Sequence, residues 1–172
     1  MAVKKVLQFG DPRLRAKCSR ASFGSGSNRR IMLDLRDTLL NLQKIHGKGG
    51  GLAAPQLGCL ERIIFVSAKG RSFYIFNPRI TEKSKRMFNV WDFCFSNNAS
   101  FLARISRHYR VTVEFQDENG ENQRETFSGY FSELFQHEID HLNGVLFIDH
   151  IRDPSSIVMM EEWDRQLKHK QH

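Results

Sequence analysis

The sequence predicts an α+β fold, because apolar residues follow a helical spacing near the beginning and the end of the chain and a strand-like alternation in between. The chain has 172 residues, of which 40% are hydrophobic and 26% are charged, as is usual for a globular protein. It contains no internal repeat and no low-complexity stretch. We therefore expect a single domain over 1–172, with a helix, several antiparallel strands, a second helix and a shorter third helix.

The first predicted element is an amphipathic helix. Residues 24–28 (GSGSN) form a loop that ends in a helix N-cap candidate, Asn28. Apolar residues then recur at helical spacing over 29–46, so we expect a helix with one buried face. The glycines at 49–51 cannot continue it, and they mark backbone that takes a positive φ or approaches another group closely.

The middle of the chain has strand patterns, and two helical patterns follow. A hairpin turn is expected at Asn119-Gly120, between two alternating segments. Pro154 stands where the start of a helix tolerates proline. We expect strands at 62–66, 72–76, more weakly within 79–90, 109–115 and 123–128, and helices at about 128–142 and 155–168.

Charge and cysteine content exclude several classes of protein. Lys and Arg number 26 against 19 Asp and Glu, and the net charge of +7 is dispersed in small groups, which favours general contact with polyanions over binding of a specific nucleic-acid sequence. No apolar run approaches the about 18–20 residues of a membrane span, and the first residues lack the apolar core of a signal peptide, so we expect a cytoplasmic protein. The three cysteines include no CxxC pair, which argues against a disulfide framework.

The sequence HEIDH at 137–141, inside the second predicted helix, has the HExxH pattern. His137 and His141 are four residues apart and share one helix face, so both can bind one metal ion. Glu138 lies beside them, where its carboxylate can take a proton from a water molecule that the metal acidifies and pass it to a leaving amine. The simpler alternative is a surface helix with two solvated histidines.

A catalytic metal usually has a third protein ligand, and the residues alone leave its identity open. Glu161, Glu162 and His150 follow the HExxH segment, but His150 is not at a metzincin spacing. Cys94 lies upstream, on a strand or at a strand end. The alternative for Cys94 is a small buried hydrophobic residue, which is the commoner role of a lone cysteine.

Three ordered segments resemble the peptide deformylase family. GGGLAAPQ at 49–56 matches the family's GxGLAAPQ segment, HEIDH followed by LNGVLF matches its HExDH segment, and DFCFS at 92–96 stands where the family has EGCLS. The opening VLQFGDPRLR and the separations also match, so the resemblance runs from about Val6 to His150. It implies a peptide-deformylase-like fold in which antiparallel strands pack around the HExxH helix, with N-terminal and C-terminal helices.

The resemblance also implies roles for individual residues. Glu138 would be the general acid and base, and the Gln56 side-chain amide with the backbone N–H of Phe95 would stabilise the oxyanion. Gly51 would let the backbone approach the substrate. The metal would be one divalent ion, Fe²⁺ in the cell and often Zn²⁺ or Ni²⁺ after purification. Its ligands would be Cys94, His137 and His141.

The substrate pocket departs from the family pattern at several positions. Phe93 and Phe95 replace a glycine and a leucine beside the cysteine, and the shorter Asp92 replaces a glutamate that can pair with an arginine such as Arg107. A carboxylate in an apolar pocket costs several kcal/mol unless it is paired or protonated, so either Glu133 turns outward or the pocket is not built for an unbranched thioether. The expected pocket residues are Gly49, Leu52, Val90, Asp92, Phe93, Tyr130, Glu133 and Leu134.

The function expected from these features is metal-dependent removal of the N-formyl group from the N-terminal methionine of new peptides. Two alternatives are an amidase of the same fold that acts on another N-formyl or N-carbamoyl compound, and a non-catalytic homologue. A zincin-type peptidase is disfavoured, because the segment at 49–56 has no role in it. We expect a monomer that contacts the polyanionic ribosome, with the basic end of the third helix, 165–170, as a candidate contact.

Overall fold

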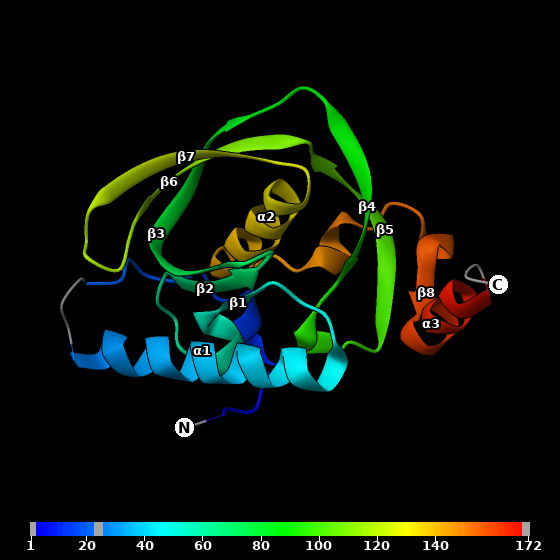
Figure 1. Cartoon of the computed structure of the whole chain (residues 1–172), viewed down its shortest axis with the longest axis horizontal. Helices are drawn as coiled ribbons and strands as arrows, with labels where there is room; N and C mark the ends of the chain where they lie inside the picture. Colours follow the sequence, from blue (N-terminus) through cyan, green and yellow to red (C-terminus); the bar gives the residue numbers. More distant parts are fainter. Residues whose placement is uncertain (1–2, 23–25, 170–172) are drawn as a thin grey trace.

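Two antiparallel sheets lie on either side of helix α2 (Tyr130–Leu142) in the computed structural model, which describes residues 3–22 and 26–169 (Figure 1). The larger sheet has the strand order β1-β2-β3-β6-β7, and the smaller sheet has the order β4-β5-β8. All strand pairs in both sheets are antiparallel. The predicted α+β arrangement of antiparallel strands around the HExxH helix is confirmed.

The strands and helices have the following bounds. The strands are β1 (Gly51–Ala53), β2 (Ile63–Ala68), β3 (Arg71–Lys83), β4 (Met87–Phe93), β5 (Phe101–His108), β6 (Arg110–Gln116), β7 (Asn122–Ser128) and β8 (Ile157–Met159). The other α-helices are α1 (Gly26–His46) and α3 (Met160–His169). Five short 3₁₀ helices are described: η1 (Pro12–Arg15), η2 (Ala54–Leu57), η3 (Phe95–Asn97), η4 (Phe147–His150) and η5 (Pro154–Ser156).

Strand β2 is buried on both faces, because α2 covers one side of the larger sheet and α1 covers the other (Figure 1). Its alternating side chains divide accordingly. Ile64 and Val66 pack in the cluster that contains Phe135 of α2, whereas Ile63 and Phe65 pack in the cluster that contains the α1 leucines. Each fully buried apolar side chain contributes about 1.5–3 kcal/mol, so these two layers hold α2 firmly against the sheet.

The start of α1 differs from the prediction. The helix begins at Gly26, so Asn28 lies inside its first turn and is not the N-cap. Its side-chain amide instead donates a hydrogen bond to the backbone carbonyl of Ser22, at 2.5 Å, which ties the helix to the preceding segment. Residues 24 and 25 of the predicted loop, and Lys170 of the predicted basic tail, lie outside the described residues.

Three strands were not predicted, and the third helix is shorter than predicted. β1 forms directly at the end of the glycine segment, and β5 pairs with the whole length of β4. Residues 157–159, expected to be helical, form β8 against β5, and α3 begins only at Met160. β5 was not predicted because Arg104 and Arg107 interrupt the alternation of its apolar residues. Arg107 is nevertheless buried, and it pairs with two carboxylates.

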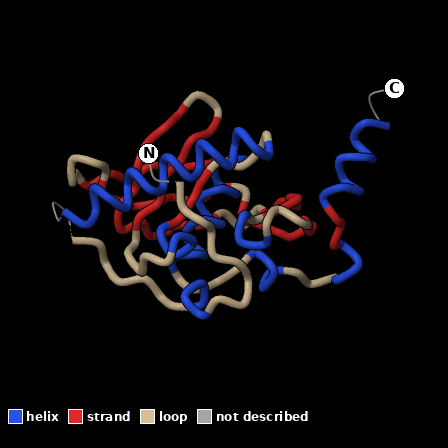
Figure 2. The backbone as a smooth tube through the Cα atoms, turned by 90° about the horizontal axis from the view of Figure 1, so that it is seen from below, coloured by secondary structure: helices blue, strands red, loops and turns tan. Residues whose placement is uncertain are grey.

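Helix α3 projects from the rest of the molecule, as the view from below shows (Figure 2). Two contacts fix it beside β4 and the loop before β1. The Trp163 ring lies 4.7 Å from the Trp91 ring, centroid to centroid, and Lys48 Nζ lies 3.2 Å from a carboxylate oxygen of Asp164. In the described part of the chain, no helix has the length and apolar character needed to cross a lipid bilayer.

The extended segment before α1 hydrogen-bonds to three parts of the chain that are distant in sequence. Leu7 N–H donates to the carbonyl of Gln56 at 2.8 Å, and Phe9 N–H donates to that of Ser96 at 2.7 Å. Cys18 N–H donates to the carbonyl at the end of α2, Leu142, at 2.9 Å. This segment therefore ties η2, η3 and α2 together.

Candidate active site

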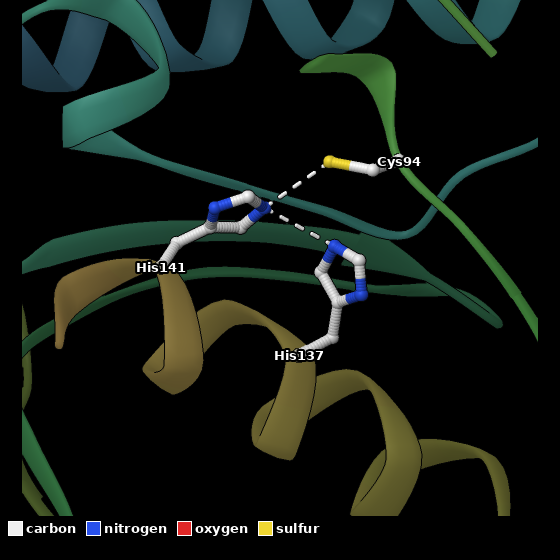
Figure 3. A group of neighbouring side chains, drawn as sticks. All are labelled: Cys94, His137 and His141. Carbon is white, nitrogen blue, oxygen red and sulfur yellow. Dashed lines mark hydrogen bonds between the residues drawn. The ribbon is translucent and has the colours of Figure 1, made fainter. Parts of the chain in front are cut away.

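A cluster of three buried side chains lies where α2 meets the end of β4 (Figure 3). His137 and His141 are one helical turn apart, and their Nε2 atoms are separated by 3.2 Å. Cys94 follows β4, and its Sγ lies 3.2 Å from Nε2 of His141. The three ligand atoms lie within 4.8 Å of one another, and all three residues are buried. The structure thus brings together the three residues that the resemblance implied as metal ligands.

Asp92 and Ser96 orient two members of this cluster. An Asp92 carboxylate oxygen lies 2.8 Å from Nδ1 of His137, so this ring nitrogen carries the proton and Nε2 presents its lone pair to the cluster. The backbone N–H of Ser96 donates to Cys94 Sγ at 3.3 Å, which fixes the direction of this side chain. A thiolate and two imidazole nitrogens suit a borderline-soft divalent ion such as zinc or iron. The donor set therefore fits the implied metal.

Arg107 supports the site from β5. Its guanidinium is almost fully buried, and it donates one hydrogen bond to Asp92 at 3.0 Å and one to Asp140 of α2 at 2.5 Å. The predicted Asp92–Arg107 pair is therefore confirmed, despite the shorter side chain. Burial opposes ionisation of Asp92, but His137 and Arg107 outweigh it and lower the pKa of this carboxyl to about 2.

Glu138 is buried beside the cluster, and its Oε2 makes no hydrogen bond within the described chain. Burial raises the pKa of this carboxyl to about 7, although His137 acts in the opposite direction. A Cβ atom on Gly51 would lie 2.7 Å from Glu138 Oε1, closer than real Cβ contacts allow. Gly51 thus makes room for the Glu138 carboxylate, a reason for the glycine that the sequence did not reveal.

Gln56 and Phe95 supply hydrogen-bond donors next to the cysteine. Gln56 is buried; its Oε1 accepts from the backbone N–H of Ala53 at 2.9 Å, which fixes the orientation of the amide. Its Nε2 donates to Ser96 Oγ at 3.3 Å and lies 3.6 Å from Cys94 Sγ. Phe95 is the first residue of η3, so no carbonyl of that helix accepts from its N–H. Gln56 and Phe95 both line one cavity.

This cavity has a volume of about 330 Å³ and opens directly onto the cluster. The Phe93 and Phe95 rings meet edge to face, with centroids 5.7 Å apart, and the Phe95 ring occupies the space where a Cβ of Gly49 would lie. The added rings therefore form part of its wall. The predicted pocket residues that line it are Gly49, Asp92, Phe93, Tyr130, Glu133 and Leu134.

Leu52 and Val90 were also expected at the pocket, but they lie in the hydrophobic core. Leu52 alternates with Gly51 along β1, so it faces the α1 side of the sheet. Val90 packs in the cluster that contains Ala103 and Ile105 of β5. Three lining residues were not predicted: Lys48, Gly50 and Trp91. Gly50 belongs to the glycine run that was singled out, whereas Lys48 and Trp91 carried no signal beyond adjacency to the motifs.

A comparison with known families identifies this arrangement. The family model described as polypeptide deformylase matches residues 3–156. The chain belongs to the peptide deformylase family. The matched region includes all three ligand candidates and Glu138, and it ends before α3.

Individual relatives agree with this assignment. A peptide deformylase of Thermomicrobium roseum is 36% identical over 166 residues, covering 91% of this chain and 90% of the relative. A peptide deformylase of Heliobacterium modesticaldum is 35% identical over 153 residues, covering 89% of this chain and 97% of the relative. The crystal structure of a Thermotoga maritima peptide deformylase superimposes with a TM-score of 0.80 at 31% identity, covering 89% of this chain and all of that one. The predicted family, fold and enzyme class are confirmed: the chain is a metal-dependent hydrolase of the deformylase type.

Proposed function

We propose that this chain hydrolyses the formamide bond at the N-terminal methionine of newly made peptides, with Glu138 as its general acid and base. The observation that carries the proposal is the position of the buried Glu138 carboxylate beside the Cys94, His137 and His141 cluster, on the wall of an open cavity. A solved structure of an Acinetobacter baumannii peptide deformylase, described as bound to Met-Ala-Ser, supports the substrate class. It shares 26% identity and a TM-score of 0.80 with this chain.

The metal ligands and Glu138 have separate roles in the reaction. When bound by Cys94, His137 and His141, a divalent metal supplies Lewis acidity toward the formyl oxygen and toward water. Glu138, whose pKa is about 7, takes a proton from the attacking water and later delivers it to the departing amine nitrogen. The products are formate and a peptide with a free amine.

Negative charge develops on the formyl oxygen as water adds to the carbonyl carbon. The Gln56 amide and the Phe95 N–H are the donors that stabilise this oxygen. Gln56 is held in place before substrate arrives, because its own oxygen already accepts a hydrogen bond from Ala53. This fixed orientation avoids the cost of reorganising the amide during the reaction.

The native metal in this proposal is Fe²⁺, with Zn²⁺ or Ni²⁺ as functional substitutes. The thiolate and imidazole donors suit all three ions. Loss of activity in air, restored by anaerobic reloading, is the expected behaviour of the iron form, because an iron-bound thiolate oxidises readily. Activity that is indifferent to air and peroxide indicates a redox-inert metal instead.

We place the enzyme in the cytoplasm as a monomer that works near the ribosome. The net charge of +7 supports attraction to a polyanionic particle, and formylated chains emerge there. Cosedimentation with ribosomes at low and high salt tests the contact, and gel filtration with light scattering tests the monomer.

The deciding experiment is an anaerobic assay of iron-loaded protein on formyl-Met-Ala-Ser. Glu138→Gln should lower kcat at least about 10²–10⁴-fold while metal content stays unchanged, because only the proton-transfer group is lost. Cys94→Ala should reduce metal content.

Other outcomes of this assay discriminate the alternatives. Hydrolysis of only other formamides or carbamoyl compounds would identify a same-fold amidase, and bound metal without any amide hydrolysis would identify a non-catalytic homologue. Unchanged metal content in Cys94→Ala would refute the ligand assignment.

A further inference from the structure

An open groove continues the catalytic cavity toward the hairpin between β2 and β3. The groove has a volume of about 630 Å³, and it shares Lys48, Gly49 and Tyr130 with the wall of the cavity. The rest of its wall comes from α1, from the end of β2 and from the hairpin. A peptide that is too long for the cavity can therefore extend into this groove.

The glycine segment at 49–51 indicates which part of a substrate reaches the groove. Gly51 lies beside the Glu138 carboxylate, whereas Gly49 lines both the cavity and the groove. Successive residues of an extended chain are about 3.3 Å apart, so a substrate passes from one of these glycines to the other over two of its own residues. A peptide with its formamide at Glu138 therefore has its first side chain in the cavity and its third residue at the groove.

The groove and the cavity carry opposite charges. Among the described residues, the wall of the groove contains three cationic side chains and no carboxylate: Lys48, Lys69 and Arg71. The wall of the cavity contains three carboxyl groups: Asp92, Glu133 and Glu138. The groove is therefore the part of this continuous surface that attracts a carboxylate of the substrate.

Lys69 is the cation of the groove that has no carboxylate partner in the described part of the chain. The other two are paired: Lys48 with Asp164 at 3.2 Å and Arg71 with Glu125 at 3.1 Å. The Lys69 Nζ atom lies over the Tyr130 ring, 4.7 Å from its centroid. Because Tyr130 lines both the cavity and the groove, this contact holds the ammonium group where the two meet.

We propose that Lys69 is a specificity-determining residue that favours formyl-methionine peptides with an acidic third side chain. The inference rests on the proposed function and deepens it: the first residue stays methionine, and the third residue ranks these peptides among themselves. A carboxylate at the third position meets the Lys69 ammonium in an open groove, where an exposed ion pair changes an equilibrium about two- to fivefold. The preference is therefore graded, and peptides with a neutral third side chain remain substrates.

Two peptides of matched shape test the inference. Formyl-Met-Ala-Glu and formyl-Met-Ala-Gln, both with an amidated C-terminus, differ only in the charge of the third side chain. In low salt, kcat/KM for the glutamate peptide should be about two- to fivefold higher, mainly through a lower KM, because Lys69 lies away from the formamide. The ratio should approach one at about 1 M salt, where the Debye length is only about 3 Å.

Substitutions at two lysines locate the effect. Lys69→Met keeps the apolar part of the side chain and removes its charge, so it should bring the ratio of the two kcat/KM values to about one. Lys69→Glu should invert the ratio. Lys83→Met removes an exposed lysine that lines neither the cavity nor the groove, and it should leave the ratio unchanged. Metal content and circular dichroism of every variant show whether the site is intact.

Calorimetric binding of the product amides Met-Ala-Glu and Met-Ala-Gln to the metal-loaded protein tests the selectivity without turnover. Tighter binding of the glutamate product, lost in Lys69→Met but kept in Lys83→Met, supports the inference. A ratio near one in the unmodified protein, or a ratio that Lys69→Met leaves unchanged, overturns it, while hydrolysis of formyl-Met-Ala-Ser upholds the proposed function. Absence of hydrolysis for every formamide overturns the proposed function, and product binding then still decides the selectivity of the groove.

Discussion

Asp92 is one methylene group shorter than glutamate, yet it contacts both His137 and Arg107. It can do so because β4 and β5 are paired along the whole of β4, which brings Arg107 against the end of α2. Because the Asp92 side chain is short, the backbone of β4 must lie close to both of these partners. The side chain therefore has little conformational freedom. Asp92 therefore fixes both the tautomer and the direction of the His137 ring.

Asp92→Asn tests this role. The variant keeps the size of the side chain but removes its charge, so it should weaken metal affinity about 10–100-fold, as is typical when the partner of a ligating histidine is changed. Competition between the protein and a chelator measures the affinity. Asp11→Asn, which alters an exposed pair with Arg13, serves as the control and should bind metal normally. Equal affinities of the two variants would show that Asp92 does not orient His137.

Gly51→Ala tests the close approach of β1 to the general base. The new methyl group would lie 2.7 Å from Glu138 Oε1, so the carboxylate must move. We expect kcat to fall about 10-fold or more, because small misplacements of a catalytic group are costly, with metal content unchanged. Normal kcat would mean that Glu138 has room to move without loss. Gly70→Ala is not a matched control, since Gly70 has a positive φ.

The reactive residues could be predicted from the sequence, whereas the wall of the cavity could be predicted only in part. The spacing of His137 and His141 fixes a shared helix face, and the ordered motifs assign Cys94 to the same centre. Leu52 and Val90 were misplaced because the face of a strand depends on which layers cover the sheet. Sequence adjacency to a motif does not contain that information.

At the scale of elements, α3 contacts two residues that line the cavity, Trp91 and Lys48. Trp163 packs on Trp91, and Asp164 pairs with Lys48; both partners line the cavity. Trp91 belongs to β4 and Lys48 to the loop before β1, so one helix bridges two walls of the site. The family match, residues 3–156, includes both of these wall residues and ends before the helix.

Trp163→Ala should raise KM several-fold with little change in kcat. The variant removes an aromatic contact of about 0.5–1.5 kcal/mol that positions Trp91, but no group that touches the formamide. Steady-state kinetics on formyl-Met-Ala-Ser measures both constants. Gln166→Ala, an exposed position on the same helix, is the control. If kcat of Trp163→Ala falls as much as its kcat/KM, with KM unchanged, the result would contradict a purely positional role for α3.

The elements that sequence patterns missed are those that tertiary pairing creates. β8 has three residues and forms only because β5 lies beside it, and β1 forms on β2 within a glycine-rich segment. Long periodic segments such as α1 and α2 were predicted well, because each one can bury its apolar face on a single neighbouring layer.

At the scale of the whole molecule, Arg107 links β5, β4 and α2 through Asp92 and Asp140. Arg107→Met should lower the free energy of unfolding at pH 7 by about 3–5 kcal/mol, because the buried Asp92 and the half-buried Asp140 lose the guanidinium that they share. Urea unfolding of the metal-free proteins measures the difference. Arg13→Met, which removes an exposed pair, should have little effect.

The same difference should depend on pH. The pKa values of Asp92, about 2, and of Asp140 lie below the ordinary 3.8, so the stability that these pairs contribute is present above about pH 4. It is lost as the pH falls through the lowered pKa values of the two carboxyls, of which that of Asp92 is about 2. The gap between Arg107→Met and the unmodified protein should therefore narrow from pH 4 to pH 2, and a constant gap would contradict the assignment.

The hydrogen bonds of the N-terminal segment also determine when the site can form during synthesis. Leu7, Phe9 and Cys18 leave the ribosome first, but their backbone partners extend to Leu142, at the end of α2. The ligands at 94, 137 and 141 are likewise separated by long stretches of chain, and such long-range contacts slow folding. The enzyme therefore acquires its metal only after most of its own chain has been translated, and a chain stalled before α2 has no site to load.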